Sequence, residues 1–201
     1  MLVHRPPARP CFARARVCAD AFTLLELLVV LGLIGIAAAI ALPRFDRSRV
    51  NVDAQALSVR GVLIIAQRAA VTRGLDVLVV FDTARRLLRV QEDPNGNMAL
   101  DAGEVMTATA VEGDVSFSRG SAPQLRAGQG AGVNFVARQS GRPVLVFHRD
   151  GSASEAGVFY LTTTRSANGT YAADTRAFDV QRATGRAVAY RYDGTAWRRE
   201  F

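Results

Sequence analysis

Lysine, cysteine and histidine are scarce or missing in this sequence. All 25 basic residues are arginine, and the 201 residues include only two cysteines and two histidines. Cys11, Cys18 and His4 lie within the first 21 residues, so His148 is the one histidine in the rest of the sequence. Residues 22–201 therefore offer no disulfide, no thiol nucleophile and no cluster of soft metal ligands.

The residue sets of common enzymes are missing as well. The sequence contains no glycine-rich phosphate loop, no zinc-ligand spacing and no serine–histidine–aspartate set. His148 is followed by Asp150, but His-Arg-Asp-Gly at this place is typical of a tight turn between two strands. We therefore predict that the protein is not an enzyme and has no catalytic residue.

One long apolar run is present, and it contains a single charge. In residues 24–42 only Glu26 is charged, and at 1.5 Å per residue a helix of this length spans about 29 Å. That length is close to the thickness of the hydrocarbon core of a bilayer. A carboxylate in such a segment is costly without a partner, so Glu26 is a functional-site candidate.

The start of this run carries a spaced set of residues. The block Phe22-Thr-Leu-Leu-Glu26 resembles the processing site of type IV prepilins and type II secretion pseudopilins. Gly35 and Pro43 lie where that family usually has glycine and proline, whereas Ala21 stands where it usually has glycine.

The resemblance implies how this segment is processed and what it does. Residues 1–21 would be a prepilin leader, which the prepilin peptidase removes by cutting between Ala21 and Phe22 before the new Phe22 amino group is methylated. Residues 22–43 would form a transmembrane helix in the inner membrane. During filament assembly, Glu26 would pair with the Phe22 amino group of a neighbouring subunit.

Two other interpretations of the segment remain open. An ordinary secretory signal also has a basic front and an apolar stretch, and Ala39-Ile40-Ala41 offers a cleavage site of the required kind. A plain single-pass anchor, with the preceding arginines held in the cytoplasm, has the same composition. In either case the rest of the chain would be a simple secreted or membrane-anchored β-domain.

After Pro43 the pattern stays helical. We expect an amphipathic helix at 44–74 that continues from the transmembrane helix, is kinked or loosened at Pro43, and ends at Gly74. Apolar residues at steps of three, four or seven predict its apolar face: Val50, Ala54, Leu57, Gly61, Ile64 and Val71.

Residues 75–201 have the pattern of a β-rich globular domain. Short strands separated by turn residues predict antiparallel sheets packed on the second half of the helix, which is an α+β fold. We expect residues 119–132 to form a flexible loop. The expected strands are 75–81, 86–90, 105–111, 115–118, 133–137, 143–148, 157–163, 177–182, 186–192 and 196–200.

This layout resembles the GspH/FimT family of minor pseudopilins and minor pilins. The residues that carry the resemblance are Phe147-His-Arg-Asp-Gly-Ser152 and Gly185-Arg186 before a strand. It implies a pilin-like fold, in which a long N-terminal transmembrane and amphipathic helix packs on antiparallel sheets of a sandwich-like periplasmic domain. It also implies a minor pseudopilin of a type II secretion system, with other pseudopilins as its partners.

The segment 93–104 has the spacing of a calcium loop. Oxygen-bearing side chains at its first, third, fifth, ninth and twelfth places resemble an EF-hand loop, although Met98 replaces the glycine of the sixth place. A plain polar hairpin loop with Pro94-Asn95-Gly96 as turn formers is the other interpretation. The candidate ligands for weakly bound calcium are Asp93, Asn95, Asn97, Asp101 and Glu104.

The C-terminal stretch is rich in arginine and aromatic residues, a combination that suits phosphates and unstacked bases. Arg182, Arg186 and Arg191 resemble in part the arginines through which some FimT-like minor pilins bind DNA in natural transformation. On extended strands Arg182 and Arg186 share a face, whereas Arg191 points the other way. We therefore predict only weak, non-specific DNA binding, and the outward face of ordinary strands is the other interpretation.

Overall fold

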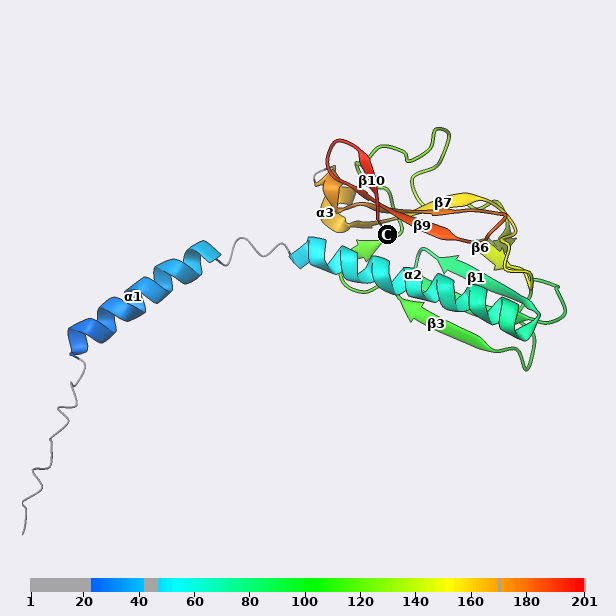
Figure 1. The fold of residues 1–201 in the computed structure, drawn as a ribbon, viewed down its shortest axis with the longest axis horizontal. Helices are drawn as coiled ribbons and strands as arrows, with labels where there is room; N and C mark the ends of the chain where they lie inside the picture. The colour runs from blue at the N-terminus through cyan, green and yellow to red at the C-terminus, as the bar shows by residue number, and fades with distance from the viewer. Residues whose placement is uncertain (1–22, 42–46, 170, 201) are drawn as a thin grey trace, which may run out of the picture. The chain divides into compact units, whose positions relative to one another are not determined.

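A computed structural model describes residues 23–41, 47–169 and 171–200 of the chain, and it divides the chain into two compact units at residues 1–45 and 46–201. The first unit contains helix α1 (Leu24–Ala41), drawn in blue in Figure 1. Its apolar side chains from Leu24 to Ile36 are exposed. Among the described residues, no helix has both the length and the apolar character needed to span a membrane. Ala21, Phe22 and Pro43 lie outside the described residues.

The second unit begins with helix α2 (Arg47–Arg73), which confirms the long helix predicted for this part of the chain. It ends where predicted. Gly74 has a φ of 69°, which a residue without Cβ adopts at no steric cost, and its N–H donates to the Ala70 carbonyl at 3.0 Å.

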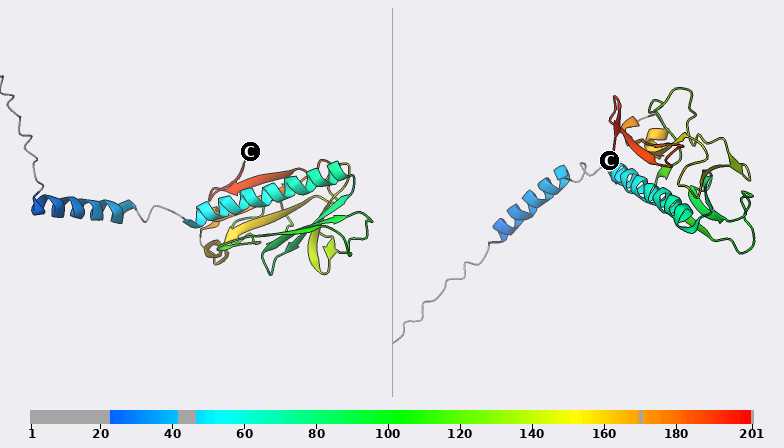
Figure 2. Two further views of the ribbon diagram at one scale, coloured as in Figure 1. Left: turned by 90° about the horizontal axis from the view of Figure 1, so that it is seen from below. Right: turned by 45° about the vertical axis from the view of Figure 1, so that its right-hand side comes forward.

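Two five-stranded antiparallel sheets follow, and helix α2 lies across strands of both (Figures 1 and 2). The first sheet has the order β3 (Met106–Ala110), β2 (Leu87–Asp93), β1 (Asp76–Asp82), β6 (Arg142–Phe147), β5 (Arg138–Gln139). The second has the order β10 (Trp197–Arg199), β9 (Ala187–Tyr192), β8 (Arg176–Val180), β7 (Gly157–Thr163), β4 (Val115–Ser116). The predicted α+β fold, with a long helix packed on antiparallel sheets, is confirmed.

The sequence missed three elements and misplaced a fourth. Helix α3 (Thr164–Ala167), the 3₁₀ helix η2 (Ala172–Asp174) and the short strand β5 were not predicted, and the strand expected at 133–137 is wrong. At that place the N–H groups of Val136 and Ala137 donate to the Glu155 carboxylate at 2.9 Å. A side chain therefore satisfies the backbone there, where a neighbouring strand would otherwise do so.

The predicted strand at 105–111 is present as β3, but it is an exposed edge strand. The backbone on either side of β3 also pairs with the β2 side of the sheet. The Glu92 N–H donates to the Val105 carbonyl, and the Val111 N–H donates to the Arg86 carbonyl. The other edge of β3 has no neighbouring strand among the described residues.

One apolar core joins α2 to both sheets. Phenylalanine rings fill its centre, with Phe159 stacked on Phe178 at 4.8 Å and tilted against Phe81 at 5.0 Å between ring centroids. The helix contributes residues that are spaced alternately by four and three, which keeps them on one face. We call them the buried stripe: Val52, Ala56, Val59, Leu63, Ala66 and Ala70.

The face of α2 that packs on the sheets is therefore not the predicted one. Val50, Leu57, Ile64 and Val71, which the sequence pattern indicated, are exposed, and Leu57 is 69% exposed. The two sets are offset by two residues, or about 200° around the helix axis, so they lie on nearly opposite faces. We call the predicted set the exposed stripe; its members are Val50, Ala54, Leu57, Gly61, Ile64 and Val71.

Candidate functional site

The exposed apolar surfaces of the two helices are the first candidate site. In α1, Glu26 lies in the first turn, where its N–H donates to Thr23 Oγ1 at 3.2 Å, and Leu24, Leu25 and Leu27 around it are exposed. In α2, the exposed stripe runs from the first turn to the last. Large exposed apolar patches mark protein–protein or membrane interaction sites, and apolar residues with this spacing form the faces through which helices pack.

The predicted pairing of Glu26 with a neighbouring amino group stays a prediction. Phe22, which would supply that group, and the cleavage site before it lie outside the described residues.

The second candidate site is the loop between β2 and β3, which contains the predicted calcium ligands. The Asp93 carboxylate is buried and accepts the backbone N–H groups of Asn97 at 3.2 Å and Met98 at 2.9 Å. Met98 has a φ of 57°, so it adopts at the sixth place the conformation for which calcium loops use glycine. The loop therefore has the sharp turn despite the missing glycine.

The remaining candidate ligands contact one another. Asp101 accepts the side-chain amides of Asn95 at 2.8 Å and Asn97 at 2.7 Å, and these hydrogen bonds hold the pKa of Asp101 below its usual value. Glu104 accepts the Asp101 N–H at 3.0 Å through Oε2, while its Oε1 is buried and accepts no hydrogen bond from the described residues.

No group of three or more acidic, histidine or cysteine side chains is placed to hold a metal ion in residues 23–41, 47–169 and 171–200. Calcium binding by Asp93, Asn95, Asn97, Asp101 and Glu104 thus stays a prediction.

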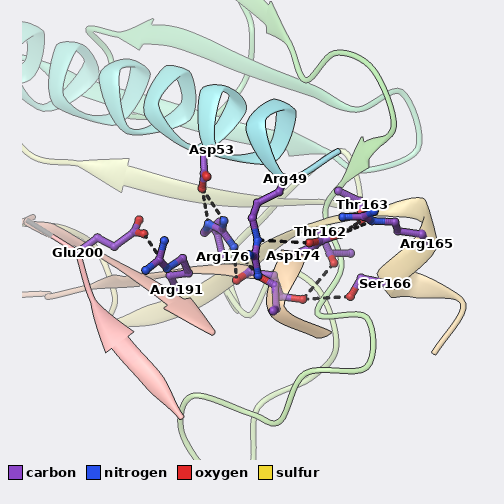
Figure 3. A network of polar contacts seen from close by, with 12 residues as sticks. Arg49, Asp53, Thr162, Thr163, Arg165, Ser166, Asp174, Arg176, Arg191 and Glu200 are labelled. Carbon is purple, nitrogen blue, oxygen red and sulfur yellow. Dashed lines mark hydrogen bonds and ion pairs between the residues drawn. The ribbon is translucent and has the colours of Figure 1, made fainter. Parts of the chain in front are cut away.

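The three predicted DNA-binding arginines lie in different surroundings. Arg182 lines a cavity of about 290 Å³ with His148 and Ser152. Arg191 points toward the helix side of its sheet, where its Nε lies 3.6 Å from Glu200 Oε1 (Figure 3). Arg186 is exposed and directly precedes β9.

Close packing explains why position 185, next to Arg186, is a glycine. A Cβ at Gly185 would lie 2.3 Å from the Gly151 carbonyl oxygen and 2.5 Å from Gln67 Nε2. Gln67 Nε2 donates to the carbonyls of Gly151 and Thr184, both at 2.7 Å, and so ties α2 to both turns. The glycines in the two family-like segments therefore meet at one helix side chain.

His148 and Asp150 do not form a catalytic pair. Asp150 accepts the backbone N–H and hydroxyl of Ser152, which lower its pKa, and the Gly151 N–H donates to the His148 carbonyl at 2.8 Å. The His148 ring instead contacts Asp76 at 3.0 Å. The predicted turn is thus present.

A polar network that the sequence did not indicate holds the start of α2 (Figure 3). Arg176, only 1% exposed, donates from Nε to Asp53 Oδ1 at 2.6 Å. Asp174, also buried, accepts Arg165 Nε at 2.5 Å and the Thr163 hydroxyl at 3.0 Å, and Arg49 lies 3.9 Å away. Asp53 and Arg176 are 123 positions apart along the chain, so no local pattern could reveal the network.

The chain is similar to known proteins in sequence and in fold. The chain is 28% identical to the fimbrial protein EcpB of Eikenella corrodens over 131 residues, which are 60% of this chain and 80% of that protein. The chain has a pilin-like fold, in which a long helix packs on two antiparallel sheets. It is also similar to the structure of the minor pseudopilin EpsH from the type 2 secretion system of Vibrio cholerae, with a TM-score of 0.46, 14% identity, and coverage of 69% of this chain and 97% of EpsH. No protein-family model matches the chain.

Proposed function

We propose that this pilin-like protein is a minor pseudopilin of a type II secretion system, a structural subunit of the pseudopilus. The observation that carries the proposal is the exposed stripe of α2, which lies opposite the stripe that packs on the sheets. When one apolar face of a helix packs on the sheets of its own chain, the second apolar face can pack on another helix. Burial of each exposed leucine, isoleucine or valine would contribute about 1.5–3 kcal/mol.

The N-terminal segment supports the same role. In the proposal, cleavage between Ala21 and Phe22 removes residues 1–21, and the segment 22–43 anchors the subunit in the inner membrane before assembly. The β-rich domain at 75–201 lies in the periplasm and contacts other pseudopilins. Glu26 then pairs with the methylated amino group of Phe22 in the next subunit, where low polarity makes the pairing selective.

The cleavage step is tested by mass spectrometry of the mature N-terminus in membrane extracts. A chain that begins with N-methylated Phe22 is expected. A chain that begins at Leu42 would show that the segment is an ordinary secretory signal and that the proposal is wrong.

The pairing step is tested with Glu26→Ala. Because an unpaired Phe22 amino group would remain, crosslinking of the full chain to other pseudopilins should fall while cleavage continues. Glu112→Ala, at an exposed acidic residue of the β-rich domain, is the control that should leave crosslinking unchanged. Undiminished crosslinking of the Glu26 variant would remove this residue from the assembly mechanism.

A second candidate function is a FimT-like minor pilin that binds DNA. The fimbrial relative favours a pilus over a secretion machine. The separate surroundings of Arg182 and Arg191 argue against a shared DNA site. We expect a gel-shift titration at physiological salt to give only weak, non-specific binding. Low-micromolar binding that is lost in an Arg186→Ala, Arg191→Ala variant would favour the DNA-binding pilin.

A further inference from the structure

A groove lined by arginines lies between the first half of α2 and the β9–β10 hairpin. It has a volume of about 490 Å³. Its apolar side is formed by Leu57 of α2 together with Phe178 and Ala189 of the second sheet. The charged residues that line it are Arg60, Arg191, Arg198, Arg199, Asp53 and Glu200. The groove thus has an apolar floor and an excess of positive charge.

The carboxylates of this groove already have arginine partners. Asp53 is bound by the buried Arg176, and Glu200 lies 3.6 Å from Arg191. Arg198 pairs at 2.8 Å with an aspartate of its own hairpin. Within the part of the chain that the structure describes, Arg60 and Arg199 have no carboxylate partner. The groove can therefore accept a further acidic group.

A matching surface exists elsewhere on the same chain. Residues 90–118 contain six acidic residues and no basic one, and the loop between β2 and β3 lies within them. In this loop Leu100 is 52% exposed and is followed by the exposed Asp101. An exposed apolar side chain beside an exposed carboxylate is the complement of an apolar floor beside unpaired arginines.

The loop and the groove of one chain are far apart. Arg73, the last residue of α2, pairs with Glu92 at the start of the loop, whereas the groove is lined by α2 from Asp53 to Arg60. From Leu57 to Arg73 the helix axis extends about 24 Å. The two surfaces can therefore meet only between two copies. Such a contact joins different surfaces of the two copies, and contacts of this kind form closed rings or, where the rotation does not close, open helical arrays.

We propose that the Leu100–Asp101 tip of one copy docks in the arginine-lined groove of a second copy. Leu100 covers Leu57 on the groove floor, and Asp101 pairs with Arg60. This inference rests on the proposed role as a filament subunit and adds which parts of neighbouring copies meet.

Disulfide crosslinking of the full chain in cell membranes tests the contact. In a Cys11→Ser, Cys18→Ser background, Leu57→Cys combined with Leu100→Cys should give a ladder of crosslinked chains. Mass spectrometry should identify the disulfide between positions 57 and 100, which neither single cysteine variant can form.

Charge reversal makes the test specific. Arg60→Glu should reduce the 57–100 crosslink about tenfold, since like charges would then face each other. Asp101→Arg added to Arg60→Glu should restore it. Arg186→Glu reverses an exposed arginine outside the groove and should have no effect. An unchanged crosslink in the Arg60→Glu variant would contradict the proposed ion pair.

A photoactivatable crosslinker attached to Ile64→Cys, on the exposed stripe, captures any neighbouring subunit and so separates failure of this inference from failure of the proposed function. Crosslinks at position 64 without any between 57 and 100 would overturn the docking inference and leave the filament role standing. Absence of both would overturn both.

Discussion

The two faces of helix α2 share one spacing but differ in what covers them. On both faces apolar or small residues recur at steps of four and three, with one step of seven on the exposed stripe, and the two sets are offset by two positions. Leu63 on the buried stripe is 2% exposed, whereas its neighbour Ile64 on the exposed stripe is 39% exposed. The sheets of the same chain cover the first face. In our account, other subunits cover the second.

The composition of the faces explains why the sheets take the one they do. Half of the buried stripe is alanine, so the helix backbone can approach the sheets closely, while Leu63 fills the core near its centre. The exposed stripe has only one alanine and one glycine among its six residues. The ion pair between Asp53, which is 43% exposed, and the buried Arg176 of the second sheet then fixes the rotation of the helix.

Removal of the Asp53–Arg176 ion pair should destabilise the packing of the buried face of α2 more than any other change proposed here. Asp53→Ala leaves the Arg176 guanidinium buried without its carboxylate, which should cost about 3 kcal/mol of unfolding free energy. Denaturant unfolding of the full chain in detergent measures the loss. Glu112→Ala, an exposed acidic residue near the same end of α2, should change it by less than about 0.5 kcal/mol. An equal effect of both variants would mean that the Asp53–Arg176 ion pair does not fix the helix.

Truncation of neighbouring residues on the two faces compares them directly. Leu63→Ala should cost about 3 kcal/mol because it leaves a cavity in the core. Ile64→Ala, one position away, should cost less than about 1 kcal/mol in the isolated protein. The same unfolding measurement tests both variants. A cost at Ile64 as large as that at Leu63 would place both side chains in the core of a single chain.

Calcium binding should have the smallest effect on stability, and it should not involve either face of helix α2. If the loop with Asp93, Asp101 and Glu104 binds calcium, free calcium at ten times the dissociation constant should add about 1.4 kcal/mol of stability. Thermal unfolding with and without calcium measures it, and Glu104→Gln should abolish the gain. No shift in melting temperature up to about 10 mM, above the range of weak extracellular sites, would leave a plain polar loop.

Local patterns predicted most of the fold. Alternation and turn residues located nine of the ten strands to within a few positions, and Gly74 marked the end of α2. The strand at 133–137 failed because Glu155, which is distant in sequence, binds the backbone there. The packed face of α2 could not be chosen, since both faces carry the same spacing and only the sheets distinguish them.

The candidate site was less accessible to sequence reasoning. Glu26 and the calcium-type loop were visible because their residues are close together in the chain. The network of Arg176, Asp53 and Asp174 was not visible, because it joins strands and helices that only the fold brings together. The same holds for the arginine-lined groove, whose walls come from α2 and from the C-terminal hairpin.

The central claim is that the exposed stripe of α2 is a packing surface for neighbouring subunits. Crosslinking of the full chain to other pseudopilins in cell membranes tests it most directly, with Ile64→Arg compared with Val136→Arg. Val136 is 84% exposed and lies outside α2, so it is the matched control. We expect Ile64→Arg to abolish crosslinking at unchanged unfolding free energy, and Val136→Arg to have no effect. Normal crosslinking of the Ile64→Arg variant would contradict the account.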